Sequence, residues 1–422
     1  MTHGHGHGHA DGNLTPVEEH LAEILATVTP LAPTELSLGD VGGLVLAEDV
    51  STAGPLPSFD NSGMDGYAVR VEDVAAATEE NPVTLPVTAE IAAGDTGAYA
   101  LQPGTAIKIM TGAMLPPSAE AVVPVEWTDG GSARVTIKTG TDYGNAVRLA
   151  GEDAKAGEVL VTAGTLLKPM HIAVIAAAGR GAVLVRPRPR VVVLSTGNEL
   201  AEPGSPLVPG RIYDSNSFML AAAAREAGCL AYRRVALPDH PDEVLPAIED
   251  QLVRADLMIT TGGVSMGGEH DVVKAALQRL GTITFRKVAM QPGMPQGFGT
   301  IAPSEARAPG ERVPIFTFPG NPVSAYVSFQ LFARPALGAM QGYDGLALEK
   351  IKAQLSGPLR SPAGRRSFLR GVLDRASGVV EPLTGQGSHQ IATLGKANAL
   401  IVVPEWVVQM AAGDTAEVMV LP

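Results

Sequence analysis

The sequence predicts a multidomain protein of mixed α/β and β class, with one doubly wound α/β domain. Its 422 residues exceed one ordinary core and suggest about three domains of roughly 150 residues each. The 48 Gly and 33 Pro residues, with only 4% aromatic residues, indicate many turns between short strands. Between residues 188 and 332, short apolar runs alternate with helical patterns, which is typical of a parallel sheet covered by helices.

The first predicted helix begins at Thr15. The residues Thr-Pro-Val-Glu there supply an N-cap, a proline at the first helical position and a capping-box glutamate, Glu18. One apolar face then follows at helical spacing, formed by Val17, Leu21, Ile24, Leu25 and Val28.

A small all-β unit is predicted next. Residues 36–49 are rich in turn formers, and strand-like pieces occur at residues 83–87 and 134–138. An apolar helical pattern at residues 169–178 is expected to pack back on the first helix, so the β unit is interpreted as an insertion.

The α/β domain is expected from residue 188 onward. Residues 191–194 are wholly apolar and β-branched or leucine, as in a strand buried on both faces. Further strands are predicted at 231–236, 257–261 and 313–318, and helices at 217–227, 241–254 and 323–332. After residue 340 short strands return, the last near 399–403 and 417–421, which indicates a separate β domain.

The acidic composition limits the possible partners. A net charge of −13 and a pI near 5.2 provide no broad positive field for nucleic acid or an anionic membrane. An anionic ligand therefore needs a local site. The first residues lack signal-peptide features and no apolar run approaches the ~20 residues of a membrane span, so we expect a cytoplasmic protein.

Two short features carry little chemistry. Residues 1–13 are expected to form a disordered His/Gly tail, which either binds metal ions loosely or has no native role; its histidines are His3, His5, His7 and His9. The single cysteine, Cys229, excludes an intrachain disulfide and a cysteine-based zinc site, and is interpreted as a small buried residue.

The strongest local motif is TTGGVSMG at residues 260–267, directly after a predicted buried strand. Its glycines let backbone N–H groups approach a ligand closely, and its hydroxyls add donors for phosphate oxygens. It is neither a Walker A loop nor a GxGxxG fingerprint. The alternative interpretation is a plain turn.

A second loop, FPGNPVS at residues 318–324, follows another predicted strand. Two prolines fix its path and present backbone and amide groups just before a helix. A rigid connection without a binding role is the alternative.

Carboxylates occur after successive strands of the predicted sheet, at Glu199, Asp239 and Asp271. Acids gathered at one edge of a sheet repel each other unless they bind a cation or accept hydrogen bonds from a ligand. Asp214 and Asp239 are equally well interpreted as helix caps.

Three polar segments lie earlier in the chain, at residues 60–68, 108–113 and 148–153. The first is also consistent with an exposed Asx-rich turn. We expect these segments to meet the α/β loops across a subunit contact.

Together these segments resemble the molybdopterin molybdenumtransferase family, which is shared with the C-terminal domain of gephyrin. The resemblance covers about residues 15–420, in family order. The matching stretches are residues 62–68, 110–113, Arg148 with 151–153, 195–197 with 199–200, 261–267 and 319–324.

The resemblance implies an elongated homodimer whose chains each have four domains. These are a discontinuous helical domain (14–55 and 147–188), an inserted β domain (56–146), a molybdopterin-binding α/β domain (189–338) and a C-terminal β barrel (339–422). The cleft would lie between the α/β domain of one subunit and the inserted domain of the other.

The implied reaction consumes adenylylated molybdopterin and molybdate, releases AMP and leaves molybdenum on the pterin dithiolene, with Mg²⁺ as the expected cofactor. The implied catalytic residues are Asp65, Thr111, Asp153, Glu199, Asp239, Asp271 and Lys287, and Glu199, Asp239 and Asp271 would also hold the metal. The implied ligand-binding residues are Ser195, Thr196, Gly197, Gly262, Gly263, Ser265, Gly267, Pro319, Gly320 and Asn321. Transient contact with the molybdopterin adenylyltransferase is a further implied partnership.

One departure from the family affects the oxyanion site. Residues 290–295 read MQPGMP where many relatives read KPGKP, so Gln291 and Met294 replace two lysines. The site would then depend more on Lys287, Arg286 or the C-terminal domain. The C-terminal candidates are Arg365, Arg366 and Arg370, with Ser388, although an arginine cluster is often a solvated face.

Two alternative functions remain open on the sequence. A molybdopterin adenylyltransferase shares the α/β domain and its glycine-rich loop, but about 180 residues precede that domain here and about 80 follow it. A gephyrin-like scaffold is the second, and the presence of Glu199, Asp239 and Asp271 favours catalysis over it.

Overall fold

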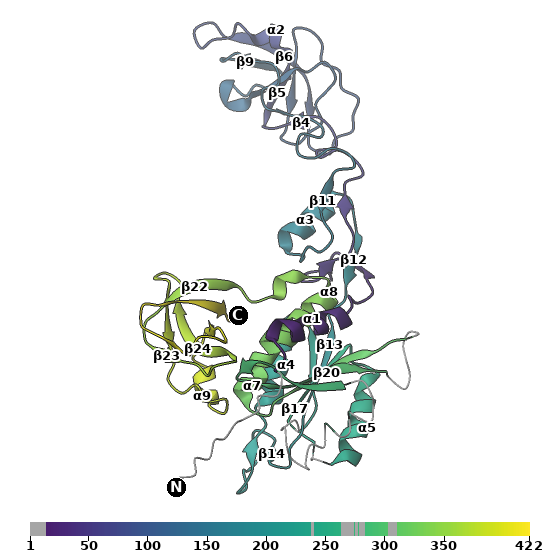
Figure 1. Cartoon of the computed structure of the whole chain (residues 1–422). Helices are drawn as coiled ribbons and strands as arrows, with labels where there is room; N and C mark the ends of the chain where they lie inside the picture. The colour runs from purple at the N-terminus through teal and green to yellow at the C-terminus, as the bar shows by residue number, and fades with distance from the viewer. Residues whose placement is uncertain (1–13, 238–239, 263–273, 275–276, 278–282, 303–309) are drawn as a thin grey trace, which may run out of the picture. The chain divides into compact units, whose positions relative to one another are not determined.

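The computed structural model describes residues 14–237, 240–262, 274, 277, 283–302 and 310–422. The chain divides into two compact units (Figure 1). Unit 1 comprises the described residues up to 34, residues 43–47 and residues 185–422, and unit 2 comprises residues 35–42 and 48–184. None of the helices in these ranges is long and apolar enough to cross a membrane.

Unit 1 is built around a six-stranded sheet in the order β16-β13-β17-β21-β20-β18. Four strands are parallel: β13 (Arg190–Ser195), β16 (Leu230–Arg233), β17 (Leu257–Thr261) and β21 (Val313–Phe318). The doubly wound sheet is thereby confirmed. Its strand order reverses between β13 and β17, and ligands of such sheets bind at that reversal, beyond the carboxyl ends of the strands.

Two strands extend the sheet in antiparallel pairing and were not predicted. They are β20 (Pro295–Ile301) and β18 (Ile283–Lys287). An ideal Cβ on Gly297 would lie 2.7 Å from the Phe285 ring. Glycine is therefore the residue that lets β18 and β20 pair closely at this point.

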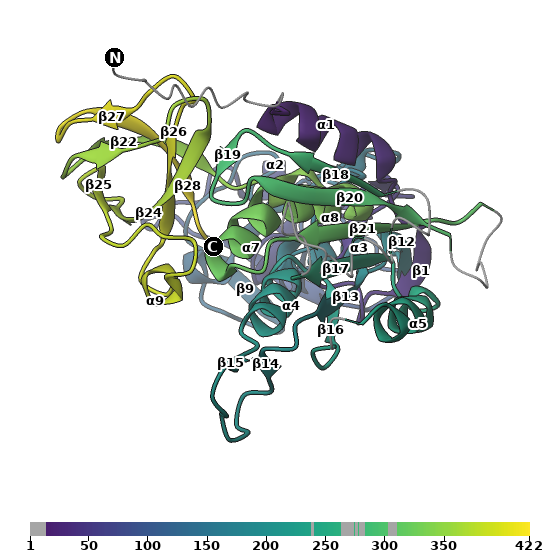
Figure 2. The ribbon, with the colours of Figure 1, turned by 60° about the horizontal axis from the view of Figure 1, so that its bottom comes forward.

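Helices cover both faces of this sheet (Figure 2). Alternate residues of β13 point to opposite faces of the sheet. Val191 and Val193 belong to the core on one face, and Val192 and Leu194 belong to the core on the other. The second core is covered by α5 (Pro241–Leu252). The first is covered by α4 (Asn216–Glu226), α7 (Pro322–Ser328), the π-helical turn η2 (Phe329–Ala333) and α8 (Arg334–Gln341). The predicted helix at 323–332 thus continues to residue 341.

The first helix, α1 (Val17–Thr27), belongs to the core of unit 1, to which it contributes Val17, Ile24 and Val28. Leu25, predicted on the apolar face, is exposed. The predicted capping box is wrong. Thr15 pairs its backbone with residues 287 and 289, Pro16 is the N-cap and no side chain caps the helix. Glu18 instead pairs with Arg366.

The C-terminal part of unit 1 is a closed five-stranded barrel, so this part of the predicted fold class is also confirmed. Its strands are β22 (Lys350–Leu355), β24 (Arg366–Asp374), β25 (Val379–Pro382), β26 (Ala399–Val403) and β28 (Thr415–Val420). The pairing of β24 with β26 closes the ring. The short strand β19 (Met290–Gln291) pairs with β24 and links the α/β domain to the barrel.

Smaller elements complete unit 1. They are β2 (Val45–Leu46), the pair β14 (Leu200–Ala201) and β15 (Ile212–Tyr213), η3 (Asp344–Leu346), the pair β23 (Leu359–Arg360) and β27 (Gln409–Met410), and α9 (Ile391–Leu394). Cys229 is buried as predicted, and burial raises the pKa of its thiol to about 12.

Unit 2 contains a five-stranded sheet in the order β8-β5-β7-β6-β9. Its strands are β5 (Gly66–Val69), β6 (Val83–Ile91), β7 (Ala106–Ile109), β8 (Ala121–Pro124) and β9 (Arg134–Ile137), with the short helices α2 (Val71–Val74) and η1 (Val125–Trp127). Two ladders pair β4 (Asn61–Ser62) with β10 (Val147–Arg148), and β3 (Val50–Ser51) with β11 (Val159–Val161). The predicted helix near residue 169 is α3 (Pro169–Ala177). The strands β1 (Thr34–Ser37) and β12 (Ala182–Arg186) lie where the chain passes between the units.

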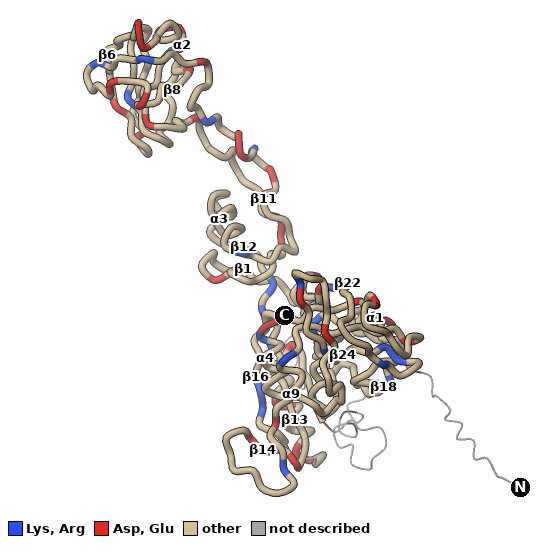
Figure 3. Tube along the Cα trace, turned by 90° about the vertical axis from the view of Figure 1, so that its left-hand side faces the viewer, with Lys and Arg blue, Asp and Glu red and all other residues tan. Residues whose placement is uncertain are grey.

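Acidic and basic positions are interspersed along both units in the view of Figure 3. This distribution agrees with the expectation that an anionic ligand requires a local site.

Candidate active site

The carboxyl ends of β13, β17 and β21 meet in unit 1. The Thr196 N–H donates to the Thr261 carbonyl at 3.1 Å, and the Gly262 N–H donates to the Phe318 carbonyl at 3.3 Å. Gly262 has φ +95°, and a Cβ at this position would lie 2.3 Å from the Thr196 carbonyl oxygen. Only glycine therefore allows the two loops to approach this closely.

Asn216, at the start of α4, ties two of these strand ends together. Its Nδ2 donates to Thr261 Oγ1 at 3.0 Å and to the Gly320 carbonyl at 2.7 Å. This residue is not among those predicted from the sequence. Its position at the start of a predicted helix that follows a strand was the available signal, since such helices begin at the ligand edge of an α/β sheet.

Asp214 lies beneath the same edge and is only 1% exposed. Its carboxylate accepts hydrogen bonds from Ser195 Oγ at 3.0 Å, the Ser217 N–H at 3.1 Å and Ser217 Oγ at 2.5 Å. Asp214 therefore caps the first turn of α4, as one of its two interpretations predicted, and also fixes the hydroxyl at the end of β13.

These loops enclose a pocket with two lobes of about 420 and 530 Å³. The lobes share Thr196, Glu199, Gly262, Gly320 and Asn321. Of the predicted ligand-binding residues, Ser195 and Pro319 also line one lobe each, and Gly197 lies against the Glu199 carboxylate. Sequence segments 195–199, 262 and 319–321 thus form one continuous wall.

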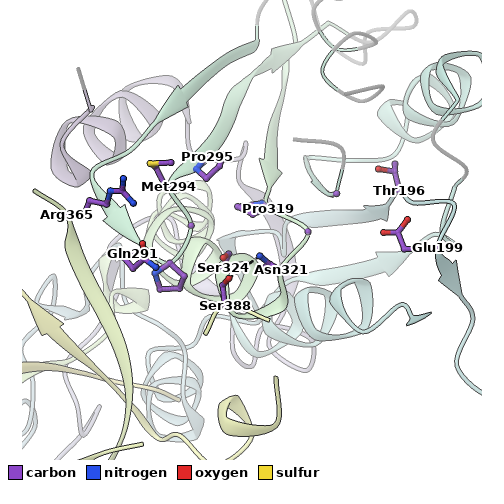
Figure 4. A pocket seen from close by; sticks show the side chains of 14 residues that line it. Thr196, Glu199, Gln291, Met294, Pro295, Pro319, Asn321, Ser324, Arg365 and Ser388 are labelled. Carbon is purple, nitrogen blue, oxygen red and sulfur yellow. Dashed lines mark hydrogen bonds between the residues drawn. The ribbon is translucent and has the colours of Figure 1, made fainter. Parts of the chain in front are cut away.

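Of the three acids predicted to bind a metal ion, Glu199 is the one that lies within the described residues. Its side chain points into the pocket beside Thr196 (Figure 4). Within the described ranges, no group of three or more His, Cys, Asp or Glu side chains could hold a metal ion. A Mg²⁺ ion commonly uses one or two carboxylates together with substrate phosphate oxygens, so the single Glu199 carboxylate, in a pocket large enough for a phosphate-bearing ligand, fits that ion.

The opposite wall of the first lobe comes from the β19 loop and the barrel. Gln291, Met294, Arg365 and Ser388 line it, with Asn321 Nδ2 donating to Ser388 Oγ at 3.0 Å. Arg365 is the cation of this lobe among the described residues, and it has no carboxylate partner there. Gln291 and Met294, the two positions where the family resemblance predicts lysine, therefore lie in the pocket wall as neutral side chains.

The other predicted cations line neither lobe of the pocket. Arg366 pairs with Glu18 and Glu405, and Arg286 pairs with Glu23 at 2.8 Å. Arg370 is fully buried and donates to the carbonyls of residues 385, 387 and 390. Lys287 is exposed on β18 and lines neither lobe.

Five predicted site residues lie outside the described residues. They are Asp239, Gly263, Ser265, Gly267 and Asp271.

Three predicted catalytic residues belong to unit 2. Asp65 Oδ1 accepts two hydrogen bonds from Thr111, from the N–H and from Oγ1, each at 2.7 Å. These bonds lower the pKa of the Asp65 carboxyl, the backbone bond most. Asp153 has an exposed side chain, and its N–H donates to the Leu56 carbonyl at 3.0 Å.

The fold and the pocket define a protein of the molybdopterin-binding class. Residues 192–339 match the family described as "Probable molybdopterin binding domain". Residues 15–179 match "MoeA N-terminal region (domain I and II)" and residues 352–421 match "MoeA C-terminal region (domain IV)".

Relatives extend this similarity over the whole chain. A Mycobacterium tuberculosis protein named molybdopterin molybdenumtransferase 2 is 44% identical over 408 residues, 95% of this chain and 98% of the relative. A Nostoc molybdopterin molybdenumtransferase is 36% identical, over 92% of this chain and 88% of its own. The crystal structure of a molybdopterin biosynthesis MoeA protein from Pyrococcus horikoshii has a TM-score of 0.82 and 31% identity, covering 97% of this chain and 99% of that one. The chain belongs to the molybdopterin molybdenumtransferase family, and its role lies in molybdenum cofactor biosynthesis.

Proposed function

We propose that this enzyme takes adenylylated molybdopterin and molybdate, releases AMP and leaves molybdenum on the pterin dithiolene. The observation that carries the proposal is the two-lobed pocket, in which Glu199 of the α/β domain faces the same space as Arg365 and Ser388 of the barrel. A ligand with a phosphate at one end and an oxyanion at the other requires two such separate polar walls.

The residues of the pocket have distinct tasks in this reaction. Following the family resemblance, the glycine-rich loop of residues 262–267 and the loop of residues 319–321 hold phosphate oxygens, and the second N–H of the Asn321 amide, which Ser388 does not accept, is one donor. Arg365 offers a guanidinium fork that matches the oxygen atoms of an anion. The reaction of these anions does not require a strong nucleophile from the protein. Positioning of the substrates and compensation of their negative charge therefore account for most of the rate acceleration.

Magnesium is the cofactor that we propose, held by Glu199 and, following the family resemblance, by Asp239 and Asp271. A bound Mg²⁺ ion would supply positive charge to the departing phosphate.

We further propose that the active form is a homodimer, in which the Asp65–Thr111 pair of the partner subunit completes each site. The support is the exposure of Asp65 and Thr111, whose hydrogen bonds leave the second carboxylate oxygen of Asp65 available. A cytoplasmic location and transient contact with the adenylyltransferase stay predictions.

The decisive experiment measures AMP release from adenylylated molybdopterin by the purified protein, with and without molybdate and Mg²⁺. We expect release to depend on both and to fall by roughly 100-fold or more in Glu199→Gln, since a lost electrostatic group commonly costs that much. Glu349→Gln, an exposed change on the barrel, is the matched control and should retain full activity.

A different outcome assigns a different step. If AMP release is absent and the protein instead forms the adenylylated pterin from ATP, the protein is an adenylyltransferase. If neither reaction occurs but a peptide tail is retained, the protein is a scaffold.

A further inference from the structure

Arg233, at the end of β16, joins three elements beside the pocket. Its guanidinium makes a two-pronged ion pair with Glu202, with Nη1 3.1 Å from Oε2 and Nη2 bonded to Oε1. Its Cζ lies 3.9 Å from the centroid of the Phe218 ring on α4. Nη1 is also 3.5 Å from Ser217 Oγ and 3.9 Å from Asp214 Oδ2.

Glu202 belongs to an arm of residues 200–213, formed by β14, β15 and the loop between them. The arm extends away from the body of the α/β domain (Figure 2). Its two strands pair with each other and with no other described strand. In the described part of the chain, the pair of Glu202 with Arg233 is the one ion pair between a side chain of the arm and the rest of unit 1.

Glu199 stands at the base of this arm. Its carbonyl accepts the Ile212 N–H at 2.8 Å, the Leu200 N–H donates to the Gly197 carbonyl at 3.1 Å, and the Asp214 N–H donates to the Ala201 carbonyl at 3.0 Å. Any rotation of the arm about its base therefore moves the Glu199 backbone. The fork of an arginine resists such rotation better than a single-point ion pair.

We propose that Arg233 is a positioning residue, which holds the arm against α4 and thereby fixes the direction of the Glu199 carboxylate in the pocket. This inference rests on the proposed function, in which Glu199 acts on the substrate. Asp214 adds to it, because the same guanidinium lies near the buried carboxylate that holds Ser195.

The test compares Arg233→Met with Arg233→Lys and with the control Arg375→Met. Arg375 makes a similar two-pronged pair with Glu349, with Nη2 2.5 Å from Oε2, but on the barrel. Hydrogen–deuterium exchange is followed in peptides covering 199–213 and, as the internal reference, β17. The kcat and KM for AMP release are measured on the same preparations.

In Arg233→Met we expect exchange over 199–213 to accelerate at least tenfold, with β17 unchanged. We also expect kcat to fall by roughly 10- to 100-fold with KM within about threefold, as expected for a misplaced catalytic group. Arg233→Lys should give intermediate values for both, because it keeps the charge but makes one bond at a time. Arg375→Met should match the unaltered protein.

Two results overturn the inference: unchanged exchange of the arm in Arg233→Met, or faster exchange with unchanged kcat. A purely structural role would lower the melting temperature and leave kcat per folded molecule intact. If the unaltered protein releases no AMP, the proposed function fails by itself, and the exchange data alone decide whether Arg233 holds the arm.

Discussion

Thr111 donates both its N–H and its hydroxyl to one oxygen of Asp65, each at 2.7 Å. Both donors stabilise the ionised carboxylate, so the pKa of Asp65 lies below its ordinary value. Asp65 is therefore held as an anion through the whole physiological range, a state that can accept hydrogen bonds but not donate a proton.

The substitution Thr111→Val removes the hydroxyl and keeps the N–H bond. We expect the pKa of Asp65 to rise toward its ordinary value but not to reach it, because the backbone bond is the larger cause. Any stability from this pair is present above the ordinary carboxyl pKa and is lost as the pH falls through the lowered one. Carboxyl-detected NMR titration measures the shift, with Asp95 as the reference carboxyl, and an unmoved Asp65 would contradict the assignment.

The burial of His20, where α1 packs against the rest of unit 1, predicts a second pH dependence, that of the stability of the fold. The side chain is 3% exposed, its ring meets Phe332 edge-on at 4.8 Å, and its Nδ1 has no hydrogen-bond partner. Burial, and then the nearby Arg286 charge, lower its pKa from 6.5 to about 4. The folded protein thus resists protonation of this ring.

Since the unfolded chain takes up this proton first, stability falls as the pH drops from 6.5 toward 4. The expected loss from His20 is roughly 3 kcal/mol. Urea unfolding across this window measures it in the unaltered protein and in His20→Phe, which should flatten the curve. His240→Gln, at a histidine whose side chain is 61% exposed, should keep the full slope; equal slopes in His20→Phe and the unaltered protein would rule out the explanation.

Gly262 permits a test of the close approach between the strand-end loops. Gly262→Ala combines a positive φ with a Cβ that would lie 2.3 Å from the Thr196 carbonyl oxygen, whereas Gly204 has φ +91° and open space around its Cβ position. Gly204→Ala should therefore cost only about 1 kcal/mol for the left-handed backbone. Gly262→Ala should cost roughly 1–3 kcal/mol more, from overpacking. Chemical denaturation of both variants checks this, and equal costs would mean that the loops separate freely.

The neutral positions 291 and 294 predict a gain of function. The double substitution Gln291→Lys and Met294→Lys places two cations in the lobe that Arg365 lines. One added charge near an anion contributes about 1 kcal/mol in a water-filled site, so we expect the KM for molybdate to fall by roughly fivefold or more. The gain should shrink at high ionic strength. Gln409→Lys, exposed on β27, is the control, and an equal effect there would indicate a global charge effect.

Three strands buried on both faces were predicted from the sequence to the residue, and a fourth, β13, was predicted one residue short at each end. The boundaries of β17, β21 and β26 follow from short apolar runs bounded by turn formers. The strands β18 and β20 were missed, because the first carries Arg286 and Lys287 and the second contains two glycines. Their pairing depends on the contact of Phe285 with Gly297, which no local pattern contains.

The residues of the pocket wall were predictable where one short sequence motif supplies them. They were not predictable where residues far apart in the sequence act together. The loop residues at strand ends were found because glycine, proline and hydroxyl residues cluster there. Asn216 and Arg233 were missed, since each acts through partners on other elements. Among the arginines, only three-dimensional pairing separates Arg365, which lines the pocket, from Arg366, which is neutralised by Glu18 and Glu405.

The helix α1 precedes, by more than two hundred residues, the segments of the chain that it packs against. Its ring contact is with Phe332, the Leu31 N–H that follows it donates to the Met340 carbonyl at 2.8 Å, and Thr15 before it pairs with Lys287. During translation, the apolar side of α1 therefore waits for more than three hundred further residues before it is covered. Contacts of such sequence separation slow folding and leave apolar surface open to aggregation in the meantime. Truncation before residue 332 therefore removes both the Phe332 ring that meets His20 and the Met340 carbonyl that accepts the Leu31 N–H, and it leaves the apolar side of α1 exposed.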